Sequence, residues 1–421
     1  MSETTLEPPD SSAGRGRAAP SPAAPTSAAP TPAAPPSAAP MPAAHSGLRL
    51  AFQPRIRRGA FFDAAWRHGC RQFSVYNRTY ITGAFGDPVA EYWQVVEKVA
   101  LWPVMGERQV EIAGHDAARF VQYLTPRDMR ACEVGQCKYA LITAPDGGIL
   151  SDPIILRLEE NRFWLSTCDF DLEAWARGVS VGAGMDVTIR DAGASVLQVQ
   201  GPASYEVMRA FCGTIIDGLR YYWFKRVPFE GTELIVSRTG WSGEYGYEVY
   251  LRDPSLGDAL FDGLLEMGAP HGIAPGAVSQ IRRIEAGILS WGADITAEES
   301  PFDVGLGRLC ALDAPIDFVG REALLAKASE PPKKRVVGLR IAGEPVLPNE
   351  TPLPLTAAGA PVGRLTSLRH SPRVGANIAL GIVAAEAAEP GTVLEVMTAE
   401  GPQLAEVTKL PFLAKKQTKR G

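Results

Sequence analysis

The chain has 421 residues, of which 46% are hydrophobic and 21% are charged, and its formal net charge is −5 at pH 7. This length is enough for two or three domains with substantial cores, and the slightly acidic balance gives no indication of nucleic acid or an anionic membrane as a partner. Because no apolar run approaches the roughly 20 residues that span a bilayer, we expect a cytoplasmic protein.

Residues 1–48 form a low-complexity segment that is rich in alanine, proline and serine. The segment has neither the basic start nor the continuous apolar stretch of a signal peptide. Frequent proline prevents helix and sheet formation and favours extended conformations. We therefore predict a disordered tail over 1–48.

From residue 49 onward, apolar periodicity predicts strands that alternate irregularly with helices. Helical spacing is found over 88–102, 114–125, 171–182, 203–213, 256–267 and 280–295. Strand patterns occupy 108–114, 139–158, 162–168, 194–202 and 231–251, and the second and last of these contain hairpin turns. Hairpins in place of β-α-β crossovers favour an α+β fold over a doubly wound parallel sheet.

Near residue 330 the pattern changes to short strands separated by glycine and proline turns. This pattern continues to the basic end of the chain and is typical of a small β-barrel or sandwich. The sequence therefore predicts a separate C-terminal unit.

Common catalytic patterns are absent from the sequence, which has no G-x-S-x-G, Walker loop, H-E-x-x-H or dinucleotide-binding glycine motif. The five histidines are scattered, and none of the six cysteines forms a C-x-x-C pair. A histidine-based hydrolase or a zinc enzyme is therefore poorly supported, and we expect the cysteines to be reduced and mostly buried.

The segment "SRTGWSGEYGYEVYL" combines acids with aromatic residues. Glu248 falls within a predicted strand, where its carboxylate either faces solvent or accepts paired N–H donors from a guanidine-like ring. In the second interpretation, Trp241, Tyr247 or Tyr250 supplies aromatic surface. Glu244 lies in the turn, and we expect it to be solvated.

Two further segments carry charged or polar side chains. The segment "QIRRIEAGILSWGADI" has helical spacing, and within it Arg283 either pairs locally or binds a ligand carboxylate. The turn "PDGGILSDP" places Ser151 and Asp152 at the start of a predicted strand.

Five segments, in order, resemble the folate-dependent glycine-cleavage T-protein (aminomethyltransferase) family. They are "GGILSDPIIL", "VLQVQGPAS", "TGWSGEYGYEV", "RRIEAGILSWGADI" and "DFVGREAL". The resemblance implies three domains around a folate channel. We therefore expect two intertwined α+β domains over 49–332 and a C-terminal barrel over 333–421.

Within that family the likeness is greatest to the tetrahydrofolate-dependent dimethylsulfoniopropionate demethylases. It rests on segments such as "FSVYNR", "ERQVEIAG", "LTPRDM" and "ESPFDVGLG". The T-protein carries two consecutive acids in its "GGIxDD" element, and the first is the catalytic acid in aminomethyl transfer. Ser151 stands at that position here, which argues against aminomethyltransferase activity, although the demethylases typically carry asparagine there.

The resemblance also implies roles for individual residues. Glu248 would hold the amino and N–H edge of the pterin ring, Tyr250 would line the methyl-transfer site, and Arg283 would lie near the glutamate or aminobenzoyl part of folate. Further candidates are Tyr139 and Trp241 for folate contacts, and Tyr76, Ser151 and Asp152 for donor contacts.

These features predict a tetrahydrofolate-dependent demethylase that transfers a methyl group from a small donor to N5 of tetrahydrofolate. Dimethylsulfoniopropionate is the best single candidate for the donor. Direct displacement requires alignment of the reacting atoms, exclusion of water and aromatic surface for a cation. We therefore expect no metal and no redox cofactor.

Several alternatives stay open. In the same class are an aminomethyltransferase and a demethylase that acts on a methylated amine, a betaine or an aryl methyl ether. An ether would need a general acid such as Tyr250 or Tyr247. In other classes are a non-catalytic folate-binding protein and a scaffold that uses the proline-rich tail. The expected partners are small molecules, without nucleic acid or membrane, and a homodimer stays open.

Overall fold

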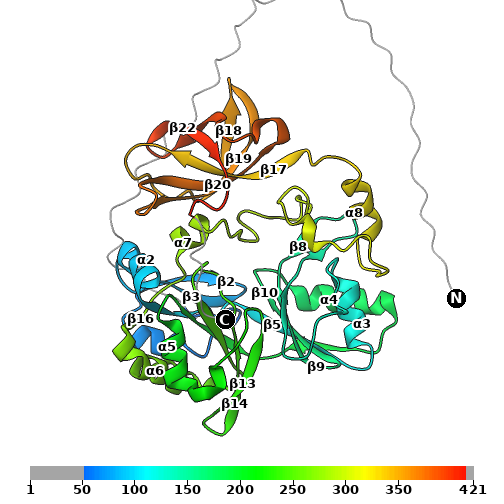
Figure 1. Ribbon diagram of the computed structural model, residues 1–421, viewed down its shortest axis with the longest axis vertical. Coiled ribbons are helices and arrows are strands. Elements are labelled where there is room, and N and C mark those ends of the chain that lie inside the picture. Colours follow the sequence, from blue (N-terminus) through cyan, green and yellow to red (C-terminus); the bar gives the residue numbers. More distant parts are fainter. Residues whose placement is uncertain (1–51, 414–421) are drawn as a thin grey trace, which may run out of the picture. The chain divides into compact units, whose positions relative to one another are not determined.

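The computed structural model describes residues 52–413, and the predicted tail over 1–48 lies outside this range (Figure 1). The described chain contains a small sheet near its start, two larger sheets and a C-terminal barrel. Helices pack on these sheets, and most neighbouring strands are antiparallel. The prediction of an α+β fold is therefore confirmed. No helix in the range 52–413 is both long and apolar enough to cross a membrane.

The small sheet and a sheet of five strands come first along the chain. The small sheet consists of β1 (Arg57–Arg58), β3 (Thr79–Ala84) and β2 (Gln72–Tyr76), with α1 (Phe62–Arg67) beside it. The five-stranded sheet has the order β11 (Thr188–Asp191), β5 (Arg108–Ala113), β10 (Arg162–Thr167), β9 (Ile154–Glu159) and β6 (Cys137–Tyr139). Helices α3 (Ala117–Leu124) and α4 (Leu172–Ala183) pack against this sheet.

A six-stranded sheet carries the segment that contains Glu248. Its order is β13 (Phe224–Phe229), β14 (Thr232–Ser237), β15 (Gly246–Leu251), β12 (Ser195–Gln200), β4 (Val99–Pro103) and β16 (Ile273–Pro275). Helices α2 (Pro88–Glu97), α5 (Ser204–Cys212) and α6 (Gly257–Gly268) pack against it.

The two large sheets share one hydrophobic core. Trp164 and Leu156 of the five-stranded sheet pack in the same cluster as Trp102, Val196 and Tyr250 of the six-stranded sheet. All five side chains are buried. Any polar group on this face of β15 is therefore removed from water, which is costly unless the group has partners.

The C-terminal unit is a closed barrel. Its strands follow the order β17 (Lys334–Ile341), β20 (Ala376–Ala384), β19 (Ala360–Ser371), β18 (Leu353–Ala357), β21 (Val393–Thr398) and β22 (Gly401–Thr408). The closed arrangement decides between the barrel and the sandwich that the turn pattern left open. Closure leaves no unpaired sheet edge.

Three predicted elements have different bounds in the structure. The predicted helix 88–102 ends at Glu97, because the next residues form β4 in the interior of the six-stranded sheet. The predicted helix 280–295 covers only α7 (Gln280–Glu285), since Gly287 has a φ of +66° and turns the chain away. The predicted hairpin over 139–158 is divided, so that β7 (Ile142–Thr143) pairs with β8 (Ile149–Ser151) while β9 pairs with β6.

Candidate functional site

Glu248 faces the core that the two large sheets share. It lies two residues from Tyr250 on β15, so both side chains point to the same face of the sheet. The carboxylate accepts hydrogen bonds from Gln198 Nε2 at 2.7 Å, from Tyr250 Oη at 2.9 Å and from Thr239 Oγ1. Burial raises the pKa of Glu248, and these donors act in the opposite direction. The three donors thus hold the carboxyl group in one orientation, at a buried position where its ionised form is disfavoured.

Gln198 adds an unused acceptor beside this carboxylate. It is the cross-strand partner of Glu248, on β12, and is fully buried. Its Oε1 has no hydrogen-bond partner among the described residues. A buried polar atom without a partner costs roughly 1–3 kcal/mol. A ligand with adjacent N–H donors would satisfy both Gln198 Oε1 and the remaining acceptor capacity of Glu248.

Glu107 is a second carboxyl group of this site, and sequence reasoning missed it. It lies between β4 and β5, where its Oε2 is 3.3 Å from Ser166 Oγ and its Oε1 is 3.5 Å from Gln198 Nε2. Burial, followed by the negative charge of Glu248, raises its pKa well above the usual range. The residue as a whole is intermediate in exposure, whereas Glu248 is buried.

Asp152 is the third carboxyl group, directly after β8. It accepts a hydrogen bond from Tyr139 Oη at 3.0 Å. Burial raises the pKa of Asp152 to about 6, against the opposing effect of hydrogen bonds from Tyr139 and Cys168. Ser151 is fully buried, and its Oγ is 2.9 Å from Thr167 Oγ1 and 3.2 Å from Cys168 Sγ. Cys168 therefore connects the two residues, because it contacts Ser151 and forms a hydrogen bond with Asp152.

We call Glu107, Asp152 and Glu248 the acidic cluster. Of the residues that the structure describes, no lysine, arginine or histidine forms an ion pair with any of the three. Tyr76, at the end of β2, lies near this cluster. Burial raises the pKa of its phenol, and so do the nearby Cys168, Asp152 and Glu107. The structure thus brings Tyr76, Tyr139, Asp152, Glu248 and Tyr250 close to one another, and their roles in one site stay a prediction.

Two further tyrosines have distinct positions, and the sequence had offered only the first of them as a candidate. Tyr247 projects from the face of β15 opposite to Glu248, and its Oη is 3.2 Å from Tyr245 Oη. Tyr222 was not predicted, yet burial, Tyr221 and the charge of Glu248 raise its pKa, which places it near the cluster. No sequence pattern marks Tyr222, since it lies in a turn with a φ of +60°.

Trp241 and Arg283 form a second group, beside the barrel. Trp241 is partly exposed in the loop between β14 and β15, with the Arg283 guanidinium 5.4 Å from its ring centre. Arg283, on α7, donates to Ser367 Oγ at 2.7 Å, to Gln280 Oε1 at 2.9 Å and to Asp294. Protein acceptors therefore surround Arg283, and its predicted contact with the folate tail stays a prediction.

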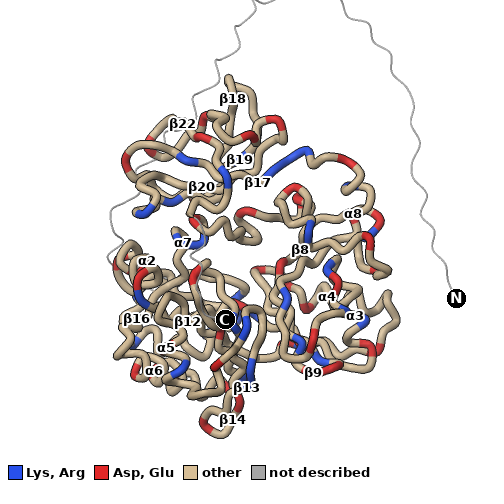
Figure 2. Tube along the Cα trace, viewed as in Figure 1, with Lys and Arg blue, Asp and Glu red and all other residues tan. Residues whose placement is uncertain are grey.

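The predicted solvation of Glu244 is wrong. Its side chain is 6% exposed and forms a 2.8 Å ion pair with Arg282. Figure 2 shows the basic residues of α7 between the barrel and the six-stranded sheet. On the same helix, Glu285 accepts from Tyr92 Oη and from Ser371 Oγ, both at 2.6 Å. Glu244 is buried because α7 packs onto the turn that carries it.

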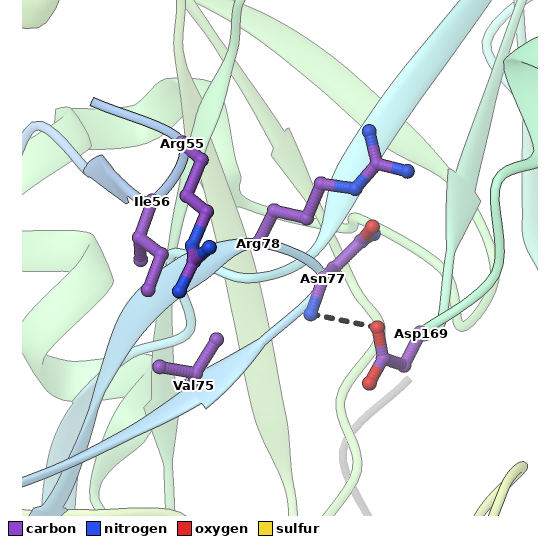
Figure 3. A pocket seen from close by; sticks show the side chains of 6 residues that line it. All are labelled: Arg55, Ile56, Val75, Asn77, Arg78 and Asp169. Carbon is purple, nitrogen blue, oxygen red and sulfur yellow. Dashed lines mark hydrogen bonds between the residues drawn. The ribbon is translucent and has the colours of Figure 1, made fainter. Parts of the chain in front are cut away.

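A surface pocket of about 600 Å³ lies near the turn between β2 and β3 (Figure 3). Its lining residues are Arg55, Ile56, Val75, Asn77, Arg78 and Asp169. Val75 and Tyr76 are neighbours on β2, so their side chains point to opposite faces. The pocket therefore lies on the face opposite to the acidic cluster, and we do not include it in the site.

Comparison with known proteins gives related sequences and a related structure. Residues 59–314 match the GCVT N-terminal domain, and residues 334–413 match the glycine cleavage T-protein C-terminal barrel domain. Dimethylsulfoniopropionate demethylase DmdA of Ruegeria pomeroyi is 36% identical over 82% of this chain and 94% of that protein. An aminomethyltransferase of Streptomyces avermitilis is 32% identical over 78% of this chain and 90% of that protein. The crystal structure of aminomethyltransferase T from Bartonella henselae superposes with a TM-score of 0.77 at 22% identity, covering 86% of this chain and 99% of that one, which shows a shared fold.

Proposed function

The chain belongs to the glycine cleavage T-protein family, an enzyme family of folate-dependent one-carbon transfer, and on this premise we propose that it is a tetrahydrofolate-dependent demethylase. It would move a methyl group from a small methylated donor to N5 of tetrahydrofolate, and dimethylsulfoniopropionate is our candidate donor. The observation that carries the proposal is the Glu248 carboxylate beside the unpartnered Gln198 Oε1. The 36% identity to a demethylase supports the donor class.

The acceptor pair fits the pterin part of tetrahydrofolate. The pterin ring carries an amino group next to a ring N–H, which are the adjacent donors that Glu248 and Gln198 Oε1 can accept. Thr239 and Tyr250 hold the carboxylate in place through its Oε2, so little ordering is left to occur on binding. Hydrogen bonds to a charged group contribute about 1.5–3 kcal/mol each.

Arg369 is our candidate for the negatively charged tail of folate. It lies on β19, next to Arg283, and donates to the Leu368 carbonyl at 2.6 Å. Among residues 52–413 it forms no ion pair. Burial and the charge of Arg283 lower its pKa to about 10. A carboxylate would relieve both effects, with Trp241 offering aromatic surface nearby.

The residues of the acidic cluster would align the reaction and handle its proton. Tetrahydrofolate supplies the N5 nucleophile that accepts the methyl group. Tyr76 and Tyr250 would line the space for the donor, and alignment alone contributes several kcal/mol. Asp152 would take up the proton that leaves N5, because its pKa of about 6 leaves it ionised at neutral pH yet basic enough to accept a proton.

The direct test is to incubate the purified protein with tetrahydrofolate and a panel of methyl donors. The panel contains dimethylsulfoniopropionate, a betaine, a methylated amine and an aryl methyl ether, and mass spectrometry detects 5-methyltetrahydrofolate. We expect product with dimethylsulfoniopropionate. Folate binding without product from any donor would favour the non-catalytic alternative, and absence of both would refute the proposal.

Glu248→Gln is expected to weaken tetrahydrofolate binding by about 1.5–3 kcal/mol, or roughly 10- to 150-fold. The substitution keeps the shape but turns one acceptor into a donor that faces the donors of the pterin. Titration calorimetry measures the dissociation constant. Glu233→Gln is the matched control, because Glu233 is half exposed and pairs with Arg226 at the surface. Equal affinity of wild type and Glu248→Gln would remove the assigned role.

A further inference from the structure

Glu107 has no role in the proposed reaction as described so far. Its two contacts, with Ser166 Oγ at 3.3 Å and Gln198 Nε2 at 3.5 Å, are long and involve neutral groups. The residue as a whole is intermediate in exposure. The carboxyl group therefore has only weak, neutral partners among the described residues.

The groups near Glu107 make its ionised form more costly, because they add negative charge and no counter-charge. They are Glu248 and Tyr250 from β15, Asp152 from the end of β8, and Tyr76 from β2. All four are acids or phenols, and none can carry a positive charge. Buried carboxylates are normally paired, because an unpaired one loses its hydration without compensation.

Glu111, four residues after Glu107, is a buried acid that does have positively charged partners, and it serves as a comparison. It is 1% exposed and forms ion pairs with Arg162 at 2.7 Å and with Arg190 at 2.5 Å. Burial opposes its ionisation, but hydrogen bonds from Trp164, Arg190 and Arg162 lower its pKa to about 2. The same segment thus carries one fully compensated acid and one acid with no described cation.

We propose that Glu107 determines the specificity for a positively charged methyl donor, by placing its carboxylate against the sulfonium or quaternary ammonium group of that donor. This inference rests on the proposed function and names the donor class of the same site. The aromatic face of Tyr76 would contact the other side of the cation. A neutral aryl methyl ether would leave the acidic cluster without a counter-charge, and Glu107 would discriminate against it.

Proton linkage follows from this arrangement. Burial and the neighbouring carboxylates raise the pKa of Glu107, which favours its protonated form in the free site. A bound cation favours the ionised form, so the proton leaves to solvent when the donor binds. Transfer of the methyl group makes the sulfur neutral, its bond electrons staying on sulfur, and Glu107 then regains a proton. The complete reaction releases one proton, the one lost from N5.

The test compares dimethylsulfoniopropionate with its carbon isostere 4-methylpentanoate, which keeps the carboxylate but lacks the sulfonium charge, and with glycine betaine, by titration calorimetry without folate. Two buffers of different ionisation heat report proton release. We expect at least one cationic probe to bind at least tenfold more tightly than 4-methylpentanoate, with release of a proton at pH 7. Glu107→Gln should lose this preference and the proton release, and keep the wild-type dissociation constant of tetrahydrofolate within about twofold.

The matched control is Glu159→Gln, because Glu159 lies on β9 with its side chain 56% exposed. This variant should behave as wild type. Equal binding of 4-methylpentanoate and of the probes with a sulfonium or ammonium group to wild type would overturn the inference. Failure of every probe with such a group to bind at millimolar concentration, or a preference that persists in Glu107→Gln, would also overturn it. The wild-type measurement tests it even if Glu107→Gln does not fold. Folate binding is measured separately, so failure of the proposed function is distinguishable from failure of this inference.

Discussion

Asp152→Asn is expected to lower kcat by roughly 100- to 10,000-fold, the usual contribution of a positioned general base. The amide can still accept the hydrogen bond from Tyr139 Oη, which is 3.0 Å from the carboxylate in the wild type. It cannot take up the proton that leaves N5. Steady-state assays at saturating substrate measure kcat. The dissociation constant of tetrahydrofolate should stay within about twofold of the wild-type value.

The pH profile separates this role from a structural one. Asp152 must be ionised to accept a proton, and burial raises its pKa to about 6, so wild-type kcat should fall about tenfold per pH unit below pH 6. Tyr139→Phe removes a hydrogen bond that lowers this pKa, so the fall should begin at a higher pH. Asp152→Asn should show no such limb. An unchanged profile in both variants would exclude Asp152 as the base.

Much of the fold follows from local sequence. The helices over 114–125, 203–213 and 256–267 were predicted within three residues of α3, α5 and α6, because each has a clear apolar stripe. Closely spaced turns predicted a small barrel or sandwich, and the family resemblance implied the barrel. Errors arose where an apolar run was compatible with both a helix and a strand. In 88–102, the last residues form strand β4, which is buried on both faces.

The site was predicted only in part, for a physical reason. Glu248 stands out because an acid in a strand between aromatic residues requires a partner. Gln198 does not stand out in the sequence, because the alternation in "VLQVQ" is typical of a strand whose glutamines lie on a polar outer face. The cross-strand register puts Gln198 directly opposite Glu248 in the core, and this register joins residues 50 positions apart. Glu107 gave no local signal, since an acid before a strand is normally solvated.

The local pairing considered for Arg283 shows the same limit. Its carboxylate partner Asp294 is 11 residues away along the chain, but its hydroxyl partner Ser367 is 84 residues away, in the barrel. The burial of Glu244 likewise depends on how α7 packs, which is a tertiary contact. Single-sequence patterns report which face of an element is apolar, and they do not report which distant segment covers it.

Asp294→Ala is expected to reduce the free energy of unfolding by about 3–5 kcal/mol, the cost of removing one partner from a buried ion pair. Arg283 is 3% exposed and would lose its only counter-charge among the described residues. Asp294 also accepts from Thr366 Oγ1 at 2.5 Å and from Ser367 Oγ at 2.7 Å, both on β19. The substitution therefore weakens the connection between α7 and the barrel as well as the ion pair. Urea unfolding followed by tryptophan fluorescence measures the change.

Two controls make this result specific to the buried pair. Asp63→Ala removes the exposed partner of Arg58, 3.4 Å away, and should change stability by less than about 1 kcal/mol. Adding Arg283→Met to Asp294→Ala removes the unpaired charge and should restore part of the loss. Because Arg283 also lies over Trp241, the double variant should recover stability without recovering full folate affinity. Loss of stability below 1 kcal/mol in Asp294→Ala would show that the barrel is held to α7 by apolar packing instead.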